Sequence, residues 1–153
     1  VPLPHLTLSS GNARYDKNVH CQAESPMLID SNIIIYAAQP QHVALRQWIA
    51  QHAPAVSAIS YVEVLGYHKL TVPEKQALEL FFAATIVLPI TQAILEEAVK
   101  LRQQHKMTPG DALIAATCLV HTLTLVTHNT KDFNWIADLS VFDPLANATS
   151  PTI

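Results

Sequence analysis

The sequence is short of charged residues and has no strong excess of either sign. Only 14% of its 153 residues are Asp, Glu, Lys or Arg, and the formal net charge is −3 at pH 7. A protein that holds nucleic acid through counterion release alone needs a broad basic surface. The composition excludes that class, so any contact with nucleic acid has to be local.

Long apolar segments are also missing. No run approaches the roughly 18 apolar residues that a membrane span needs. Residues 1–26 lack the charged start and the continuous apolar centre of a secretory signal. These absences predict a soluble protein of the cytoplasm that makes no membrane contact.

Cysteine is scarce as well. Cys21 and Cys118 form no close pair, and Cys118 lies in an apolar helical run at residues 112–120. A buried thiol is the common role for a cysteine in that setting. What the sequence does have is hydrophobic residues, which make up half of the chain and suffice for one compact domain with a sizeable core.

The start of the chain differs in composition from the rest. Residues 1–26 mix Pro, Ser, Asn, Gly and His without periodicity, so we expect an N-terminal extension outside the core, with Met27 as a plausible native start. We expect residues 27–146 to form the domain and residues 147–153 a C-terminal tail. If a chain that begins at Met27 melts much earlier or loses activity, the extension is not dispensable.

Short apolar runs then alternate with amphipathic segments. This alternation predicts an α/β fold with a mostly parallel sheet of four to five strands, covered by helices on both faces. The expected strands lie near residues 27–29, 55–59, 86–88, 123–127 and 140–142. The expected helices lie near residues 31–36, 41–51, 60–66, 71–82, 91–106 and 112–120.

Local patterns also predict where helices begin. Ser60 with Glu63, and Thr71 with Glu74, match the capping box, in which a hydroxyl and a carboxylate satisfy the first free backbone N–H groups of a helix. Pro109-Gly110 is expected to interrupt the chain, and Asp111 to cap the apolar helix that follows.

Four acids lie where predicted elements meet: Asp30, Glu63, Asp111 and Asp132. Each has an ordinary explanation as a helix cap, a capping-box residue or an exposed turn residue. However, ligands of open α/β sheets bind outside the carboxyl ends of the parallel strands, and two of these acids follow strands that should be neighbours. We therefore expect the fold to gather the four acids around Asp30.

Converging carboxylates need a positive partner. Two of them ~4 Å apart repel by about 4 kcal/mol at an effective dielectric near 20, so a cluster would raise its pKa values or open up. Oxygen ligands suit Mg²⁺ or Mn²⁺ better than zinc, which favours closely spaced His or Cys, and the eight histidines form no His-Glu-x-x-His pattern. The acids therefore predict a divalent cation of the Mg²⁺ type.

Four segments together resemble a known family. Residues 28–32, a helical Glu63, the run Asp-Ala-Leu-Ile-Ala-Ala at 111–116 and the run Val-Thr-His-Asn-Thr-Lys-Asp-Phe at 126–133 resemble the PIN domain, and within it the VapC-type toxins of bacterial toxin–antitoxin pairs. The resemblance spans residues 27 to about 145. It implies a three-layer α/β/α domain that binds Mg²⁺ or Mn²⁺ at one end of the sheet and hydrolyses RNA.

The resemblance also implies residue roles. Asp30, Glu63, Asp111 and Asp132 match the catalytic acids that bind the metal. A bound ion would activate water for in-line attack and stabilise the leaving 3′-oxygen. The polar residues that would orient the acids or line the site are Ser31, Asn32 and Asn129, with Ser31 standing where many members have Thr.

Substrate and protein contacts are implied less directly. His128 and Lys131 could contact the RNA phosphate, although a solvated loop explains them equally well. The resemblance further implies a cognate antitoxin that covers the acidic site, and a homodimer. The hydrophobic helices between Gln41 and Phe82 are candidate surfaces for both.

Two other functions stay open. Asp30 could form an aspartyl-phosphate, as in haloacid-dehalogenase-like phosphatases, but those enzymes use a second Asp two residues later, where this chain has Asn32. The chain could also be a non-catalytic member of the PIN fold that binds a partner. A calorimetric titration with Mn²⁺ separates that alternative from a metal-dependent nuclease.

Overall fold

The computed structural model describes residues 25–146. Cys21, the tail at residues 147–153 and nearly all of the expected N-terminal extension lie outside the described residues. The elements follow one another in this order: β1 (Met27–Ile29), α1 (Ser31–Ala38), α2 (Val43–His52), β2 (Ala55–Ser57), α3 (Ala58–Leu65), α4 (Val72–Ala83), β3 (Val87–Leu88), α5 (Gln92–Gln104), α6 (Pro109–His121), β4 (Thr124–Val126), the 3₁₀ turn η1 (Thr130–Asp132) and β5 (Val141–Phe142).

The strands form one five-stranded sheet in the order β3-β2-β1-β4-β5. Every neighbouring pair is parallel, and in the centre Ile29 of β1 lies opposite Val56 of β2 and Val126 of β4. The predicted parallel sheet is thereby confirmed. Because all strands run in one direction, their carboxyl ends share one edge of the sheet. The backbone pairing already begins at Pro26, whose carbonyl accepts a hydrogen bond from the Thr124 amide.

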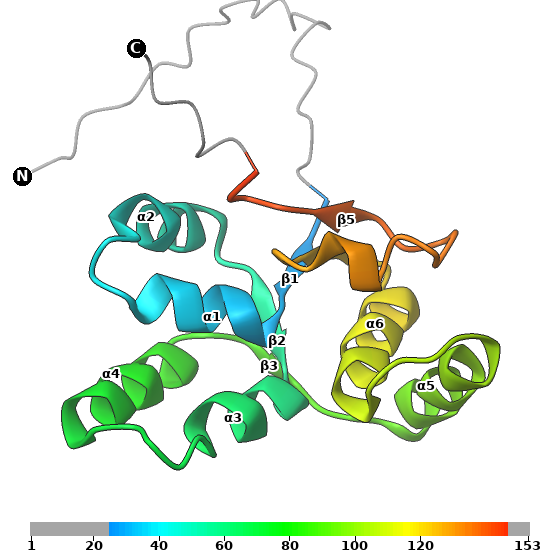
Figure 1. The fold of residues 1–153 in the computed structure, drawn as a ribbon, viewed down its shortest axis with the longest axis horizontal. Coiled ribbons are helices and arrows are strands. Elements are labelled where there is room, and N and C mark those ends of the chain that lie inside the picture. The colour runs from blue at the N-terminus through cyan, green and yellow to red at the C-terminus, as the bar shows by residue number, and fades with distance from the viewer. Residues whose placement is uncertain (1–24, 147–153) are drawn as a thin grey trace, which may run out of the picture.

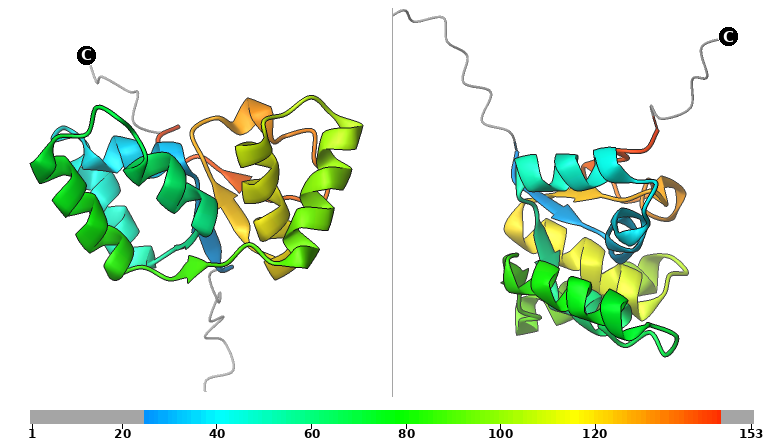
Figure 2. Two further views of the ribbon diagram at one scale, coloured as in Figure 1. Left: turned by 90° about the horizontal axis from the view of Figure 1, so that it is seen from below. Right: turned by 90° about the vertical axis from the view of Figure 1, so that its left-hand side faces the viewer.

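Helices cover both faces of this sheet, as expected for three layers. Helices α1 to α4 lie on one face and α5 and α6 on the other (Figure 1). The left view of Figure 2 shows the sheet between the two groups of helices. Successive strand residues point to opposite faces, so Leu28 and Leu125 pack with α5 and α6 while Ile29 and Val126 pack with α1 to α4. The strands are apolar on both sides for this reason.

Helix α6 illustrates how composition predicts burial. Its central residues carry no charge, and the structure buries Ala112, Ile114 and Cys118 among others, which confirms the expected buried helix. Burial, with a smaller effect of the Asp30 charge, raises the pKa of the Cys118 thiol to about 12. The thiol therefore stays protonated and behaves as a small apolar side chain. None of the helices in residues 25–146 is long and apolar enough to cross a membrane.

Two of the predicted helix starts are wrong. Helix α6 begins at Pro109 with Thr108 as its cap, so Pro109-Gly110 forms the first turn instead of a break, and Asp111 is inside the helix. Proline suits a first turn because its missing N–H would have no partner there. Helix α3 begins at Ala58 and is capped by Ser57, so the Ser60–Glu63 capping box does not exist.

The other predicted capping box is confirmed. The Thr71 hydroxyl accepts from the Glu74 amide at 3.4 Å, and the Glu74 carboxylate accepts from the Thr71 amide at 2.8 Å. Both residues are exposed, so their hydrogen bonds hold the start of α4 without help from the core.

Candidate active site

Asp30 lies at the carboxyl end of β1, where the strand passes into α1. Its side chain is the N-cap of α1: Oδ1 accepts from the Ser31 amide at 2.7 Å. Oδ2 accepts from the Thr127 hydroxyl at 2.8 Å, and the residue is only 5% exposed. Asp30 therefore does cap α1, but only through Oδ1. Its other oxygen, Oδ2, is bound by Thr127, which directly follows the neighbouring strand.

Thr127 is a site residue that sequence reasoning missed. It is fully buried and follows β4, so the parallel register that pairs Ile29 with Val126 places it beside Asp30. Besides donating to Asp30, its hydroxyl oxygen accepts from the Asn129 amide at 3.1 Å and from Nδ2 of Asn32 at 3.4 Å. The two predicted auxiliary asparagines therefore meet at this one hydroxyl. Its position could have indicated this role, because Thr127 is a small polar residue directly after a buried strand.

A pair of buried hydroxyls connects α1 to α3. The Ser31 hydroxyl donates to the Ser60 hydroxyl at 2.9 Å, and both residues are buried. Ser60 stands one helical turn before Glu63, so the two side chains leave α3 on the same side. The hydrogen bond thus fixes the distance between the helix that Asp30 caps and the helix that carries Glu63.

Glu63 itself is exposed and reaches toward the start of α6. A Cβ atom added at Gly110 would collide with Oε1 of Glu63, so this carboxylate lies directly against the backbone beside Asp111. Gly110 is the second site residue that the sequence did not reveal. Its role is to leave space for the Glu63 carboxylate, because it has no side chain. The absence of a capping box also leaves Glu63 without the ordinary role that its sequence context had suggested.

The charges of the four acids act on one another. The pKa of Asp30 is raised to about 6, mainly by burial and in smaller part by the charges of Asp111 and Glu63, against the opposing hydrogen bonds from Thr127 and Ser31. Burial likewise raises the pKa of Asp111, with the Thr108 hydroxyl opposing and the charge of Asp132 adding to the shift. The charges therefore couple Asp30 with Asp111 and with Glu63, and Asp111 with Asp132, so that every predicted acid interacts with at least one other.

Asp132, like Glu63, is exposed. It ends η1, and its backbone carbonyl accepts from Nε1 of Trp135 at 3.0 Å, which ties the turn to the segment that follows. Phe133, the next residue, is fully buried and anchors the turn in the core. These two contacts hold the C-terminal end of the turn, while Asp132 stays exposed.

The donor set fits a hard divalent cation. In the part of the chain that the structure describes, Oδ1 of Asn32 is buried without a hydrogen-bond partner, next to the buried Asp30. A carbonyl oxygen and several carboxylates are ligands that Mg²⁺ and Mn²⁺ prefer. As the side chains stand, no three His, Cys, Asp or Glu side chains within residues 25–146 are close enough to hold one ion. The acids are near one another but do not form a complete set of ligands around one point. Repulsion between carboxylates without a bound cation favours this separation.

The two predicted substrate contacts lie on the same loop. Lys131 is exposed in η1. His128 is exposed, and its Nδ1 atom lies 3.0 Å from Oδ2 of Asp143, which follows β5. His128 is therefore a fixed side chain, which the sequence alone did not indicate.

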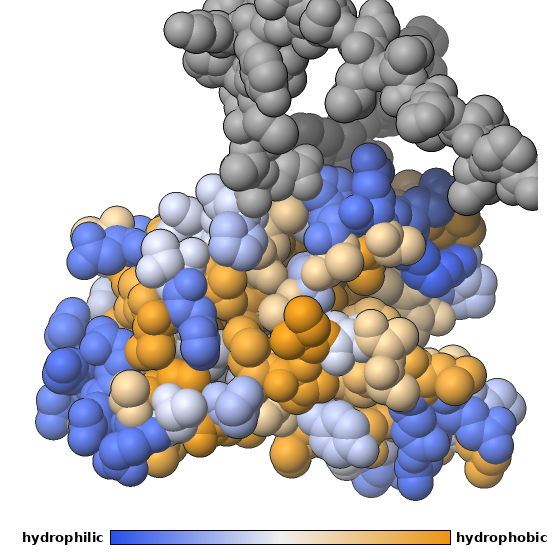
Figure 3. Space-filling model, turned by 180° about the vertical axis from the view of Figure 1, so that it is seen from behind, coloured by the Kyte–Doolittle hydropathy of each residue, from blue (hydrophilic) through white to orange (hydrophobic). Residues whose placement is uncertain are grey.

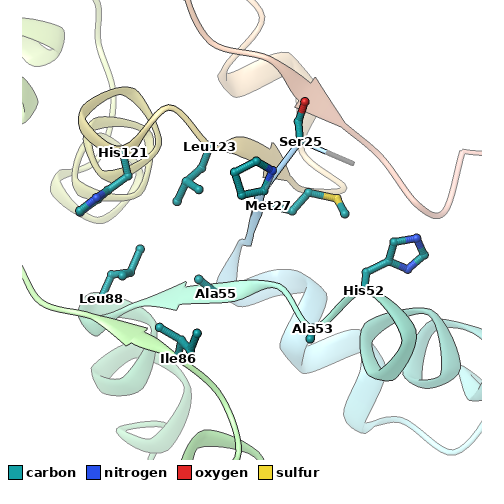
Figure 4. Close-up of a pocket in the computed structure, with 10 residues that line it drawn as sticks. Ser25, Met27, His52, Ala53, Ala55, Ile86, Leu88, His121 and Leu123 are labelled. Atoms are coloured by element: carbon teal, nitrogen blue, oxygen red, sulfur yellow. The ribbon is translucent and has the colours of Figure 1, made fainter. Parts of the chain in front are cut away.

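Two hollows in the described surface lie away from the acids. One, of about 440 Å³, is at the opposite edge of the sheet, where Met27 and Ala55 begin their strands, and His121 lies on its rim (Figure 4). The other, of about 890 Å³, lies between α1, α2 and α4. Apolar residues also gather near the middle of the rear face, flanked by polar ones (Figure 3). Neither of these two hollows includes any of the four acids.

Comparisons with known proteins agree with this geometry. The family model of the PIN domain matches residues 27–139. A chain of the toxin–antitoxin complex from Klebsiella pneumoniae is 32% identical over 76% of this chain and 95% of that one, with a TM-score of 0.63. FitAcB from Neisseria gonorrhoeae (26% identity, 78% and 99% covered, TM-score 0.63) and VapBC-1 from nontypeable Haemophilus influenzae (26%, 76% and 96%, 0.65) are also similar. No curated protein matches the chain.

Proposed function

The chain belongs to the PIN domain family, and on this premise we propose that it is a Mg²⁺- or Mn²⁺-dependent endoribonuclease that acts as the toxin of a toxin–antitoxin pair. The observation that carries the proposal is the buried Asp30 at the carboxyl edge of a parallel sheet, with a pKa raised in part by Asp111 and Glu63. The similar chain from the Klebsiella pneumoniae toxin–antitoxin complex supports the toxin role. Cleavage of cellular RNA would take place in the cytoplasm.

The four acids would hold the cation in this proposal. Asp30, Asp111 and Asp132 would bind it, and Glu63 would bind it directly or through water. When bound, the cation supplies an activated water and neutralises charge on the phosphate. Each carboxylate oxygen has two lone pairs, so the hydrogen bonds that Asp30 accepts from Ser31 and Thr127 leave both of its oxygens able to coordinate.

The other residues of the site act by positioning. The Thr127 hydroxyl donates to Oδ2 of Asp30 and accepts from the amide of Asn129. It therefore fixes the loop that leads to Asp132 relative to Asp30. The Ser31–Ser60 hydrogen bond sets the position of α3, and therefore of Glu63. Because Asp30 is buried and the net charge is −3, RNA would be held by the acid-bound cation and a few local contacts.

The direct test is cleavage of cellular RNA by the purified wild-type chain in Mg²⁺, in Mn²⁺ or in EDTA. We expect cuts at discrete sites with either metal and none in EDTA. Attack by water with departure of the 3′-oxygen leaves 5′-phosphate and 3′-hydroxyl ends, which sequencing of ligated ends detects. Intact RNA in both metals, or ends with 2′,3′-cyclic phosphate, would contradict the proposal.

The same preparation separates the two alternative functions. Mn²⁺ binding by calorimetry without any RNA cleavage would indicate a non-catalytic PIN-fold protein that binds a partner. An acyl phosphate trapped on Asp30 would indicate a phosphotransferase. We expect Mn²⁺ binding together with cleavage, and no acyl phosphate.

Gly110→Ala tests the contact between α6 and Glu63. The added methyl group displaces the Glu63 carboxylate, and we expect RNA cleavage to fall about ten- to a hundredfold, the cost of a misplacement near 1 Å. The unfolding free energy should change by less than about 1 kcal/mol, because alanine favours the helical turn and the exposed Glu63 can move. In a Glu63→Ala background the same change should have no further effect; an equal loss there would show that Gly110 acts in another way.

We further propose that the hollow between α1, α2 and α4 receives an apolar segment of the antitoxin. Its lining is mostly apolar, and it lies within the helices expected to form partner surfaces. The residues that line it include Ile34, Ala37, Ile49, Leu78, Phe81 and Ile86. An amphipathic helix docks into such a groove through its apolar face. The homodimer stays a prediction, measured by sedimentation of the purified chain.

A charge in this groove should block the antitoxin but not the nuclease. Ala77 is exposed on α4 at the groove, so Ala77→Glu should fold normally and cleave RNA at the wild-type rate. Co-expressed cognate antitoxin should then fail to relieve growth arrest. Ala93→Glu, at another exposed alanine on α5 in the other layer, is the matched control and should still be neutralised. Equal neutralisation of both variants would place the antitoxin elsewhere.

A further inference from the structure

His128 is held in one orientation by two neighbours. Its Nδ1 atom lies 3.0 Å from Oδ2 of Asp143, and the other oxygen of Asp143 accepts from the Leu145 amide at 2.8 Å. The ring of Tyr36 meets the imidazole edge to face, with centroids 5.4 Å apart and planes at 89°. The His128 side chain is 43% exposed, whereas that of Asp143 is 15% exposed. Asp143 and Tyr36 thus hold the imidazole in place, while the rest of the ring is exposed and can contact a ligand.

This fixed imidazole adjoins the acidic site. His128 directly follows Thr127, whose hydroxyl donates to Asp30, and Tyr36 lies one helical turn after Asn32 on α1. Asp143 follows Phe142, whose carbonyl accepts from the Thr127 amide at 2.9 Å. An RNA strand whose phosphate lies at the acids would therefore pass His128 with a neighbouring nucleotide.

The Asp143 contact decides which hydrogen bond His128 offers. A carboxylate only accepts hydrogen bonds, so Nδ1 must carry the hydrogen that faces Asp143. In the neutral ring Nε2 then presents a lone pair and acts as an acceptor. A phosphate oxygen is also an acceptor and cannot pair with it. The ribose 2′-hydroxyl is a donor on the RNA backbone, and it is the group that distinguishes RNA from DNA.

We propose that His128, held by Asp143 and Tyr36, accepts a hydrogen bond from one ribose 2′-hydroxyl of the bound substrate. The inference rests on the proposed ribonuclease function and deepens it, because it assigns the selection of RNA over DNA to a residue outside the four acids. One neutral hydrogen bond corresponds to about a three- to tenfold change in affinity.

The test uses a short RNA that contains one cleavage site mapped with the wild-type chain, and a series of the same oligonucleotide with a single 2′-deoxy substitution at each position. KM and kcat are measured at pH 8 in Mn²⁺. For the wild type we expect one deoxy position to raise KM about three- to tenfold with little change in kcat. His128→Ala should raise KM for the all-RNA oligonucleotide by a similar factor and lose its sensitivity to that one position.

Two further variants make the result specific. Asp143→Asn keeps an acceptor for the Leu145 amide but no longer dictates the tautomer of His128, so the sensitivity to the deoxy position should weaken. His121→Ala removes an exposed histidine at the opposite edge of the sheet (Figure 4) and should behave as the wild type does. Equal melting temperatures of the variants confirm that the fold is retained.

The outcomes separate this inference from the proposed function. If the wild type does not cut the all-RNA oligonucleotide, the ribonuclease proposal fails and this inference fails with it. If the wild type cuts it but His128→Ala leaves KM unchanged, only the inference is overturned. The same holds if His128→Ala raises KM equally for every oligonucleotide of the series, since the lost contact would then be with a phosphate or a base.

Discussion

Asp111→Asn is expected to lower RNA cleavage about a thousandfold or more, because a bound metal contributes several kcal/mol to the transition state and each 1.36 kcal/mol is a factor of ten. The amide keeps the size of the carboxylate but loses the negative charge that holds the cation. The backbone amide of residue 111 still donates to the Thr108 hydroxyl at 3.1 Å, so the start of α6 should be unaffected. Single-turnover cleavage of a mapped RNA measures the loss.

The same variant gives a clear result in cells. Expression of the wild type without antitoxin should arrest growth and produce discrete RNA ends, and Asp111→Asn should do neither. Asp138→Asn is the matched control, since Asp138 is an exposed aspartate in the segment before β5. It should arrest growth as the wild type does. Equal toxicity of wild type and Asp111→Asn would count heavily against a metal-dependent nuclease.

Asp30→Asn is expected to stabilise the metal-free protein near neutral pH by about 2 kcal/mol relative to its effect at pH 4. Burial raises the pKa of Asp30 from 3.8 to about 6, so the folded chain binds this proton more tightly than the unfolded chain does. The stability that the proton provides is complete below the unfolded value and is lost as the pH rises through about 6. An amide has no charge to bury and avoids this loss.

Urea denaturation in EDTA at pH 4 and at pH 7.5 measures the effect. The amide oxygen of the variant can keep the hydrogen bond from the Ser31 amide, and the loss of the bond from the Thr127 hydroxyl is the same at both pH values, so it cancels in the comparison. Mn²⁺ should then stabilise the wild type at pH 7.5 and leave the variant nearly unchanged, because only the wild type binds the ion when folded. A difference between the two proteins that is the same at both pH values would show that Asp30 carries no buried-charge penalty.

Much of the architecture could be predicted from local patterns. The apolar runs that became β1, β2 and β4, the uncharged run of α6 and the Thr71–Glu74 capping box all depend on residues a few positions apart. Alternation of such strands with helices limits the fold to a parallel sheet with helices on both faces. The placement of Asp30 after β1 followed from the same reasoning, and the structure confirms it.

The helix starts failed where the sequence offers two equivalent caps. Ser57 and Ser60 are both good N-cap residues, and so are Thr108 and Asp111. In each pair the structure uses the earlier one, as N-cap of α3 and of α6 respectively. The choice depends on where the preceding chain leaves the sheet or turns back toward it, and no local pattern contains that information.

The sequence by itself determined most of the strand and helix pattern and the place of Asp30 directly after a strand, because these features depend on neighbours along the chain. Only the tertiary structure decided that Thr127 holds Asp30, that Gly110 makes room for Glu63 and that Asp143 fixes His128. Those contacts join residues between 15 and 97 positions apart. They exist because the parallel register of β1, β4 and β5 and the packing of α3 on α6 bring distant backbone segments to one edge of the sheet.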